Sequence, residues 1–409
     1  MCDIGISNGT TRRGFLRGAA ALAVAHAAMG PARAGALQAR SGLLRAYVGT
    51  YTGSGSNGEG IYLVEIDRDR GEVRRQRLVA KAANPSWLVA HPSGRFLYAV
   101  NEVSDYHGNS GSVSSYSMDE SGDLRAINTV SSEGSGPAYL SIDATGRFAF
   151  VANYGGGSVA VLPIAADGSL GAAVDVHRDS GAAGAERATN APAGSFAISG
   201  HDAPHAHMVL ADPANRFVLA TDLGQDRIYV YRSDAATGKL TALAEQPFVT
   251  LPSGDGPRHV AFHPSGRWLF SIQEESSTIA RFDYEAATGR LTARQSISAL
   301  PKGFAGTSFA SEILVAANGR YLYAGNRLHD SIAIFAIGGD GTLTRVGECA
   351  TLGDYPGQFR IDPSGRFLFA CNKRSDCITT FRIHTESGML TPTGQYTGVG
   401  SPGCITFVG

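Results

Sequence analysis

One short turn phrase that ends in an arginine recurs six times along this chain of 409 residues. Each copy joins two apolar runs through a tight turn, as in HPSGRFLY, DPANRFVL and AANGRYLY. The arginines, which are spaced by 52, 69, 51, 53 and 46 residues, are Arg95, Arg147, Arg216, Arg267, Arg320 and Arg366. A period of this length is typical of structural units that stack in a line or close into a ring.

Each repeat carries the signals of four short strands, without a convincing helical pattern. Two apolar runs flank the turn, a third follows (SVAVLPI, RIYVYRS, SIAIFAI), and a turn such as GGDGTL leads into a fourth. Short β-branched and aromatic runs between turn residues predict antiparallel hairpins. Four antiparallel strands make one blade of a β-propeller, in which radial packing leaves only short exposed edges. We therefore predict an all-β propeller.

The two ends of the repeat region supply strands without the phrase. Residues 46–67 (AYVGTYT to GIYLVEID) contain two strands, and residues 401–409 (SPGCITFVG) resemble a lone inner strand. Pairing these segments in one blade would close the ring, so we predict seven blades in a single domain over residues 46–409. The composition, with 43% hydrophobic residues, 17% charged residues and 52 glycines, suits a compact body with many tight turns.

The N-terminus has the pattern of an export signal. The sequence TRRGFLR precedes an Ala-rich run over residues 18–29 and then PARAGA. This run is too short for the roughly 20 residues that span a bilayer, and the paired arginines match the twin-arginine type of signal. We expect residues 1–34 to be removed and the mature protein to be periplasmic or secreted, without membrane contact.

Removal of residues 1–34 would take away four arginines and one aspartate, which changes the net charge from −1 to −4. No basic stripe remains, so we expect no nucleic-acid partner. Four cysteines stay in a compartment that permits disulfides, namely Cys349, Cys371, Cys377 and Cys404. No metal-type C-x-x-C pair occurs among them. Buried free thiols and a disulfide between Cys371 and Cys377, which flank a predicted hairpin turn, are both open.

The repeated arginine allows equivalent positions to be compared between blades. Nine residues before it stand Ser86, Ala138, His207, Arg258, Ser311 and Gly357. Seven residues after it stand Glu102, Tyr154, Leu223, Glu274, Arg327 and Lys373. Four charged or titratable residues in adjacent blades break the symmetry of these rows, and such departures are expected at functional positions. We predict that they form the catalytic site: His207, Arg258, Glu274 and Arg327.

The residue just before the second row is almost uniform (Asn101, Asn153, Asp222, Gln273, Asn326 and Asn372), which favours a repeated structural hydrogen bond. Weaker candidates for substrate binding share or adjoin the two rows: Tyr154, His259, Glu312, Glu102 and Lys373. Each of these residues alone could be structural. The segment HDAPHAH (201–207) also suggests a metal, but it lacks a readable third ligand. We expect neither a metal nor a cofactor.

The chain resembles the lactonase family of seven-bladed propellers, which includes 6-phosphogluconolactonase and is related to carboxymuconate-lactonising enzymes. The resemblance covers residue 46 to the C-terminus and is carried by YVGTYT, VANYGGGSV, PHAHM, DLGQDRIYVY, GPRHVAFHPSGR, EESST and NRLHDSIAIF. It implies that the family's His, Arg, Glu and Arg fall on the four residues chosen above. In the last blade, YPGQFRI departs from the second Pro-Arg pair of many relatives.

This resemblance implies hydrolysis of a sugar lactone by a monomeric enzyme. Arg258 and Arg327 would stabilise the charge that develops on the carbonyl oxygen, and Glu274 would activate water, with His207 as the second candidate base. Two other functions stay open. A lactonising or isomerising enzyme would hold a dicarboxylate with the two arginines, and a non-catalytic propeller would only bind a ligand, since the fold itself carries no activity.

Overall fold

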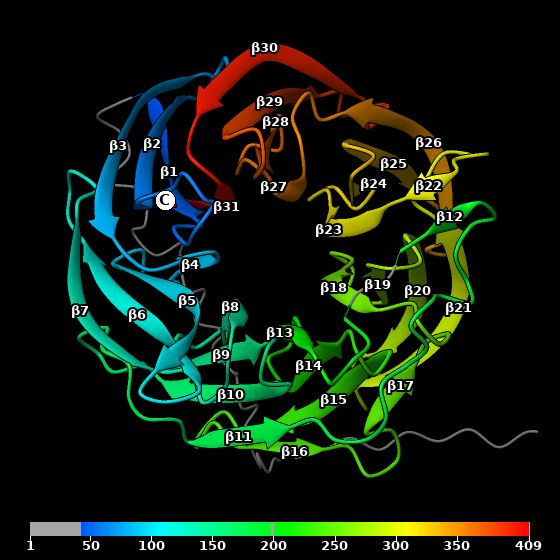
Figure 1. The fold of residues 1–409 in the computed structure, drawn as a ribbon, viewed down its shortest axis with the longest axis horizontal. Helices are drawn as coiled ribbons and strands as arrows, with labels where there is room; N and C mark the ends of the chain where they lie inside the picture. The colour runs from blue at the N-terminus through cyan, green and yellow to red at the C-terminus, as the bar shows by residue number, and fades with distance from the viewer. Residues whose placement is uncertain (1–41, 198–199, 409) are drawn as a thin grey trace, which may run out of the picture. The chain divides into compact units, whose positions relative to one another are not determined.

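The computed structural model describes residues 42–197 and 200–408, and this part of the chain forms 31 strands and no helix. Seven four-stranded antiparallel sheets surround a central axis (Figure 1), with an additional short strand in the fourth. The predicted seven-bladed propeller is therefore confirmed. The segment proposed as an export signal lies outside the described residues.

The blades follow one another along the chain, and only the first combines both ends of the described region. Blade 1 contains β1 (Leu43–Thr50), β2 (Gly60–Asp67), β3 (Val73–Lys81) and β31 (Pro402–Val408). Blade 2 contains β4 (Leu88–Ala90), β5 (Phe96–Tyr106), β6 (Ser110–Met118) and β7 (Leu124–Ser131). Blade 3 contains β8 (Pro137–Ile142), β9 (Phe148–Asn153), β10 (Ser158–Pro163) and β11 (Asp175–Arg178).

The remaining four blades repeat this order. Blade 4 contains β13 (Ala206–Ala211), β14 (Phe217–Asp222), β15 (Arg227–Ser233), β16 (Leu240–Ala242) and the extra β17 (Phe248–Thr250). Blade 5 contains β18 (Pro257–Phe262), β19 (Trp268–Gln273), β20 (Thr278–Glu285) and β21 (Arg290–Ser298). Blade 6 contains β23 (Phe309–Val315), β24 (Tyr321–Arg327), β25 (Ser331–Ile337) and β26 (Leu343–Ala350). Blade 7 contains β27 (Pro356–Ile361), β28 (Phe367–Asn372), β29 (Cys377–Ile383) and β30 (Leu390–Gly398).

The repeated arginines connect each blade to the next. Their guanidinium groups donate to a carbonyl in the outer turn of the following blade: Arg95 to Ala166, Arg147 to Ala235, Arg216 to Ala286, Arg320 to Glu386 and Arg366 to Arg68. Blade 1 lacks the phrase, and its Arg45 donates to Glu120 O of blade 2 at 2.7 Å instead. In blade 5 the role falls to Arg281, which donates to Asp340 O.

The aromatic residue after each arginine packs on a glycine of the same neighbouring turn. At Gly168, which adopts a positive φ of 85°, an added Cβ would lie 2.3 Å from Phe96 Cδ1. The same contact joins Phe148 to Gly238, Phe217 to Gly289, Trp268 to Gly341, Tyr321 to Gly388 and Phe367 to Gly71. Glycine is therefore needed both for the turn and for the close approach.

The ring closes in blade 1, as predicted, because β1 pairs with β2 on one side and with β31 on the other. The terminal strand is also held from blade 7. The Gln358 side chain on β27 accepts from Ile405 N at 3.1 Å and donates to Ile405 O at 3.4 Å. The departure in YPGQFRI thus has a structural role in ring closure.

The long spacing between the second and third arginines corresponds to a segment outside the blades. Its strand β12 (Ser195–Phe196) pairs in parallel with β22 (Gly306–Thr307), which precedes the inner strand of blade 6.

The four cysteines among the described residues are free thiols, and burial raises the pKa of Cys404 to about 12. Across the described residues, no helix has the length and apolarity to cross a bilayer.

We predict that Gln358→Ala lowers the free energy of unfolding by about 1–3 kcal/mol, because it leaves the buried amide and carbonyl of Ile405 without partners. Gln76→Ala is the matched control. Gln76 donates to Gly398 O at 2.7 Å across the same junction, but on the exposed outer strand, so its loss should cost under about 0.5 kcal/mol. Denaturant unfolding of both variants would measure the difference, and equal effects would contradict the assigned role.

Candidate active site

A β-bulge at the start of five inner strands includes two of the four predicted site residues. The pairing between the first and second strands shifts register at Pro137/Tyr139, Ala206/Met208, Pro257/His259, Ala310/Ile313 and Pro356/Gln358. The extra residue in blades 4 and 5 is His207 and Arg258. Bulges redirect side chains and are frequent beside active sites. The bulges in two successive blades therefore place His207 and Arg258 at the same end of the ring.

Three of the four predicted residues meet in one ion-pair cluster. Glu274 Oε2 lies 2.6 Å from Arg327 Nη2 and 3.0 Å from Arg258 Nε. Glu274 follows β19 and Arg327 ends β24, so the second strands of blades 5 and 6 bring them beside Arg258 of β18. All three side chains are about nine-tenths buried. One carboxylate therefore balances two guanidinium groups.

Backbone carbonyls fix both guanidinium groups further. Arg258 Nη1 donates to Ser311 O at 2.8 Å, and Arg327 Nη2 donates to Ala310 O at 2.9 Å. Burial and Arg327 lower the pKa of Arg258, against the opposing effect of Glu274. Burial also acts to lower the pKa of Arg327, but Glu274, Tyr355 and Glu275 together outweigh it and the net shift is upward. Both groups stay cationic at any physiological pH.

His207 lies beside this cluster rather than in it. Its ring contacts the rings of His259 and Tyr154 edge to face, with centroids 5.0 and 5.5 Å away. Within the described chain, Nδ1 is buried and has no hydrogen-bond partner. Burial, together with Arg258, His259 and Arg327, lowers the pKa of His207 well below its usual value. The imidazole is therefore neutral at neutral pH.

The weaker candidates separate into three places. His259 and Glu312 are almost inaccessible, at 1% and 3% exposure, and form a pair beneath Arg258 with Nδ1 and Oε1 3.1 Å apart. Tyr154 stacks on His205 with ring centroids 4.3 Å apart and faces His207 at its edge. Glu102 accepts from the Tyr51 hydroxyl at 3.1 Å.

Lys373 completes this third place, because its ammonium lies 3.4 Å from the centroid of the Tyr51 ring. Burial raises the pKa of Glu102 and lowers that of Lys373. The charge of Arg258 acts to lower the pKa of both Tyr51 and Glu102, so these two residues lie close enough to interact with it electrostatically. The residues chosen from the two sequence rows thus lie around one end of the ring.

Two contributors were missed by the comparison of repeats. Tyr355 accepts from Arg327 Nη1 at 3.3 Å and has a positive φ of 62° in the loop before β27. Tyr51 belongs to blade 1, where the arginine phrase is absent. A side chain in an irregular loop or in a repeat without its marker has no register, so only the YVGTYT resemblance pointed toward Tyr51.

The histidine-rich segment before β13 is occupied by structural hydrogen bonds. His205 Nδ1 lies 2.8 Å from Tyr154 O and Nε2 lies 2.9 Å from Asp202 Oδ1. His201 Nε2 lies 3.1 Å from Asp226 Oδ1. Both ring nitrogens of His205 are thus engaged. In the residues that the structure describes, no group of three or more His, Cys, Asp or Glu side chains has the arrangement of a metal site.

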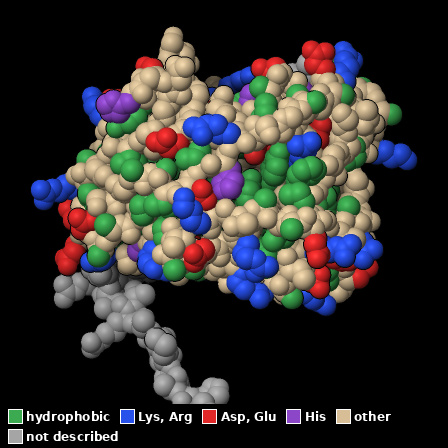
Figure 2. All heavy atoms as spheres, turned by 90° about the horizontal axis from the view of Figure 1, so that it is seen from below, with side chains coloured by type: hydrophobic (Ala, Val, Ile, Leu, Met, Phe, Trp, Pro, Cys, Tyr) green, Lys and Arg blue, Asp and Glu red, His purple; other side chains and the backbone are tan. Residues whose placement is uncertain are grey.

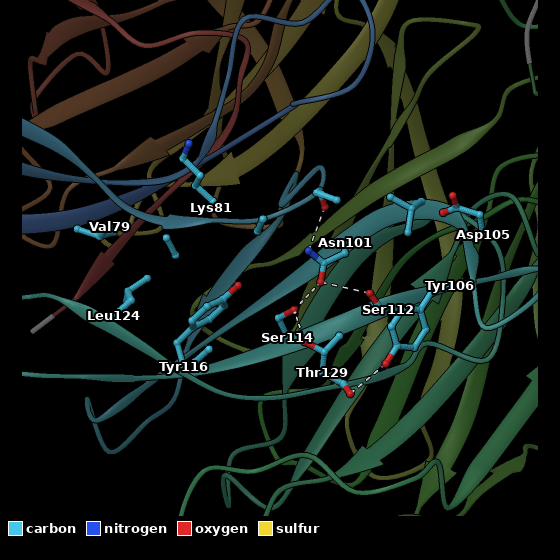
Figure 3. A pocket seen from close by; sticks show the side chains of 15 residues that line it. Val79, Lys81, Asn101, Asp105, Tyr106, Ser112, Ser114, Tyr116, Leu124 and Thr129 are labelled. Carbon is cyan, nitrogen blue, oxygen red and sulfur yellow. Dashed lines mark hydrogen bonds between the residues drawn. The ribbon is translucent and has the colours of Figure 1, made fainter.

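A groove on the outer part of the ring lies away from this cluster. It has a volume of about 690 Å³ between the outer parts of blades 1 and 2 (Figure 3), and its polar floor is satisfied internally. There Asn101 Oδ1 accepts from Ser114 at 2.6 Å, and Ser114 contacts Thr129 at 2.9 Å. The face in Figure 2 intersperses Lys and Arg with Asp and Glu. Neither surface has the converging charges of the inner site.

We predict that Glu274→Ala destabilises the fold by about 3–5 kcal/mol, since it leaves two buried guanidinium groups without a counter-charge. Glu386→Ala removes the carboxylate of an exposed pair with Arg320 and should cost less than about 1 kcal/mol. Unfolding in urea would compare them. A cost for Glu274→Ala as small as that of the control would mean that water, rather than Glu274, neutralises the arginines.

Comparison with known proteins identifies the family. The family described as "Lactonase, 7-bladed beta-propeller" matches residues 45–407. The chain is 33% identical over 364 residues to the 6-phosphogluconolactonase of Bacillus subtilis, covering 88% of this chain and 97% of that one. It is 34% identical to the 6-phosphogluconolactonase of Pectobacterium carotovorum over 76% and 83% of the two chains.

A solved structure agrees with these matches. The periplasmic gluconolactonase of Pseudomonas aeruginosa superposes with a TM-score of 0.79 at 35% identity, over 90% of this chain and 99% of that one. Both the sequence and the fold match over nearly the whole propeller. The chain therefore belongs to the lactonase family of seven-bladed β-propellers.

Proposed function

We propose that this protein hydrolyses a sugar lactone. Membership of the lactonase family supports this reaction class, as do relatives named 6-phosphogluconolactonase and gluconolactonase. The observation that carries the proposal is the cluster in which Arg258 and Arg327 share Glu274 next to the neutral ring of His207. A binding module would not need two cations, a carboxylate and a neutral base within one partly desolvated site.

In the proposed reaction, water attacks the ring carbonyl carbon, and the ring C–O bond then breaks to release the hydroxy acid. Negative charge develops on the carbonyl oxygen during the attack. N–H groups of Arg258 and Arg327 would stabilise this oxyanion, and their effect is strong because the surroundings are dry. The attacking water must also lose a proton to a nearby base, which can then return it to the ring oxygen as the C–O bond breaks.

Two residues can take that proton, and their contacts favour His207. Glu274 Oε2 already lies within ion-pair distance of both guanidinium groups, so this oxygen is engaged in orienting Arg258 and Arg327. The His207 ring is neutral and its Nδ1 makes no hydrogen bond within the described residues. This reverses the order expected from the sequence, in which Glu274 came first.

We predict that His207→Asn lowers kcat/KM for an aldonolactone by about 10²–10⁴-fold, the usual contribution of positioned proton transfer. Glu274→Gln should cause a smaller loss, because it keeps the shape of the side chain and removes only its charge. Acid release in a pH-stat would measure both. His263→Asn is the matched control, since the His263 ring bonds Gly319 O at 2.9 Å and Ser265 Oγ at 2.8 Å in an outer turn.

If Glu274→Gln causes the larger loss, Glu274 is the base. If neither variant changes the rate on any lactone that the wild type hydrolyses, the proposed site is wrong. If the wild type hydrolyses none, a ligand-binding propeller becomes the better interpretation.

We also propose that residues 1–34 direct twin-arginine export, which would place the enzyme outside the cytoplasm. An unphosphorylated aldonolactone is then the substrate that we favour, because a phosphorylated cytosolic intermediate would not be available there. The periplasmic relative supports this location.

Replacing Arg12 and Arg13 by Lys should retain the protein in the cytoplasm, because the paired arginines are read by the export receptor. Cell fractionation and the N-terminal sequence of the mature protein, expected to begin near Gly35, would test this. Unchanged export of the Lys variant would show that the motif is fortuitous.

A further inference from the structure

A second layer of buried side chains lies one residue after the position of His207 and Arg258 in each repeat. Here the ring of His259 contacts Trp87, Tyr139 and His207, with centroids 5.4, 5.3 and 5.0 Å away. A buried pair of ionisable residues in such an aromatic setting brings no necessary stability, since apolar residues of similar volume often stabilise a core as well or better. The pair of His259 and Glu312 therefore requires another explanation.

The geometry connects this pair to Arg258. Arg258 Nη1 lies 3.3 Å from both ring nitrogens of His259. An approach in the ring plane at equal distances would collide with Cε1, so the guanidinium lies over the ring face. Glu312 Oε1 contacts the edge of the ring, at 3.1 Å from Nδ1, and also accepts from Ile313 N at 3.1 Å. Its Oε2 is buried and has no hydrogen-bond partner in the described chain.

A cation can rest on the face of a neutral imidazole but is repelled by a protonated one. Burial, with Arg258, Arg360 and Arg327, lowers the pKa of His259 well below its usual value, so the ring stays neutral. Burial raises the pKa of Glu312 to about 7, against the opposing effect of Arg360 and Arg258. The other titratable groups in its field are Tyr139, Cys371 and Cys404.

We propose that Glu312 is a positioning residue, which acts through the His259 ring to hold Arg258 in the orientation needed for catalysis. With Glu312 ionised, Arg258 is attracted toward His259 on one side and toward Glu274 on the other. When Glu312 is protonated, its negative charge beside His259 is lost, and the Arg258 guanidinium turns toward Glu274. This inference rests on the proposed lactone hydrolysis for its effect on rate, but not for its effect on the pair itself.

Kinetics of Glu312→Gln and Glu312→Ala between pH 5.5 and 9 test the proposal. In the wild type, kcat should rise through an ionisation near neutral pH, where His207 itself does not titrate. Glu312→Gln keeps an acceptor for Nδ1–H and should remove this ionisation. Glu312→Ala should lower kcat by about 10–100-fold, the scale expected for a misplaced catalytic group, while KM changes much less.

Gln358→Ala is the matched control, because Gln358 occupies the equivalent position in blade 7 and contacts β31. It should lower the melting temperature and leave the ionisation in place. If Glu312→Gln keeps both the wild-type kcat and the ionisation, the proposal is wrong. Because Gln is nearly isosteric with Glu, this variant decides the matter even if Glu312→Ala does not fold.

Histidine ring ¹⁵N NMR can follow the ionisation of Glu312 through the His259 ring in the absence of substrate. The His259→Asn variant would assign the His259 signal. The His259 signal should stay that of a neutral ring, while the protonated nitrogen changes as Glu312 titrates near neutral pH in the wild type but not in Glu312→Gln. A His259 ring that does not respond to Glu312→Gln would overturn the proposal. If the wild type shows this titration but hydrolyses no lactone, the proposed reaction is wrong, while the coupling between Glu312 and His259 is retained.

Discussion

The contact between each repeated arginine–aromatic pair and the glycine turn of the next blade is the interaction on which the ring depends. It joins consecutive blades at their outer ends, and in blade 1 Arg45 supplies the hydrogen bond although the phrase is missing. Contacts that repeat at fixed positions set a constant rotation between blades. The beginnings of all inner strands then converge at one end of the axis, so residues that are about 50 positions apart in the sequence become neighbours.

The candidate site lies where the inner strands converge. Its residues differ from those of the other repeats only at the bulge positions and at the ends of the second strands. Burying a guanidinium group is costly unless it is paired and hydrogen-bonded. Glu274 pairs with both arginines, while Ser311 O and Ala310 O take further N–H groups. The cluster therefore fits inside a well-packed ring without disturbing its core, and the cost is confined to three side chains.

The sequence contained enough to predict the blades, the pairing of both ends and the convergence of four residues, because a marker at a fixed period gives every repeat a common register. It could not give the partners of those residues. The bulge that turns His259 and Glu312 under Arg258 leaves no signature beyond two consecutive polar residues. Tyr355 lies in a loop with a positive φ, where neither strand alternation nor the repeat applies. Gln358 was visible only as a departure, and its bonds to Ile405 require knowledge of where the last strand lies.

The contacts among Glu274, Arg258 and Arg327 also bear on how the site distinguishes a substrate from a transition state. In the proposed reaction, a neutral lactone carbonyl would be a weak acceptor that competes with a carboxylate for the same N–H groups, so it would gain little from the arginines. The developing oxyanion would carry a full charge and compete on equal terms with Glu274. An arrangement in which the cations are already engaged would thus favour the transition state over the ground state, and interactions of that kind raise the rate rather than the affinity. The same competition would make the orientation of Arg258 critical, because a guanidinium that turns fully toward Glu274 would have no N–H group left for the reacting oxygen.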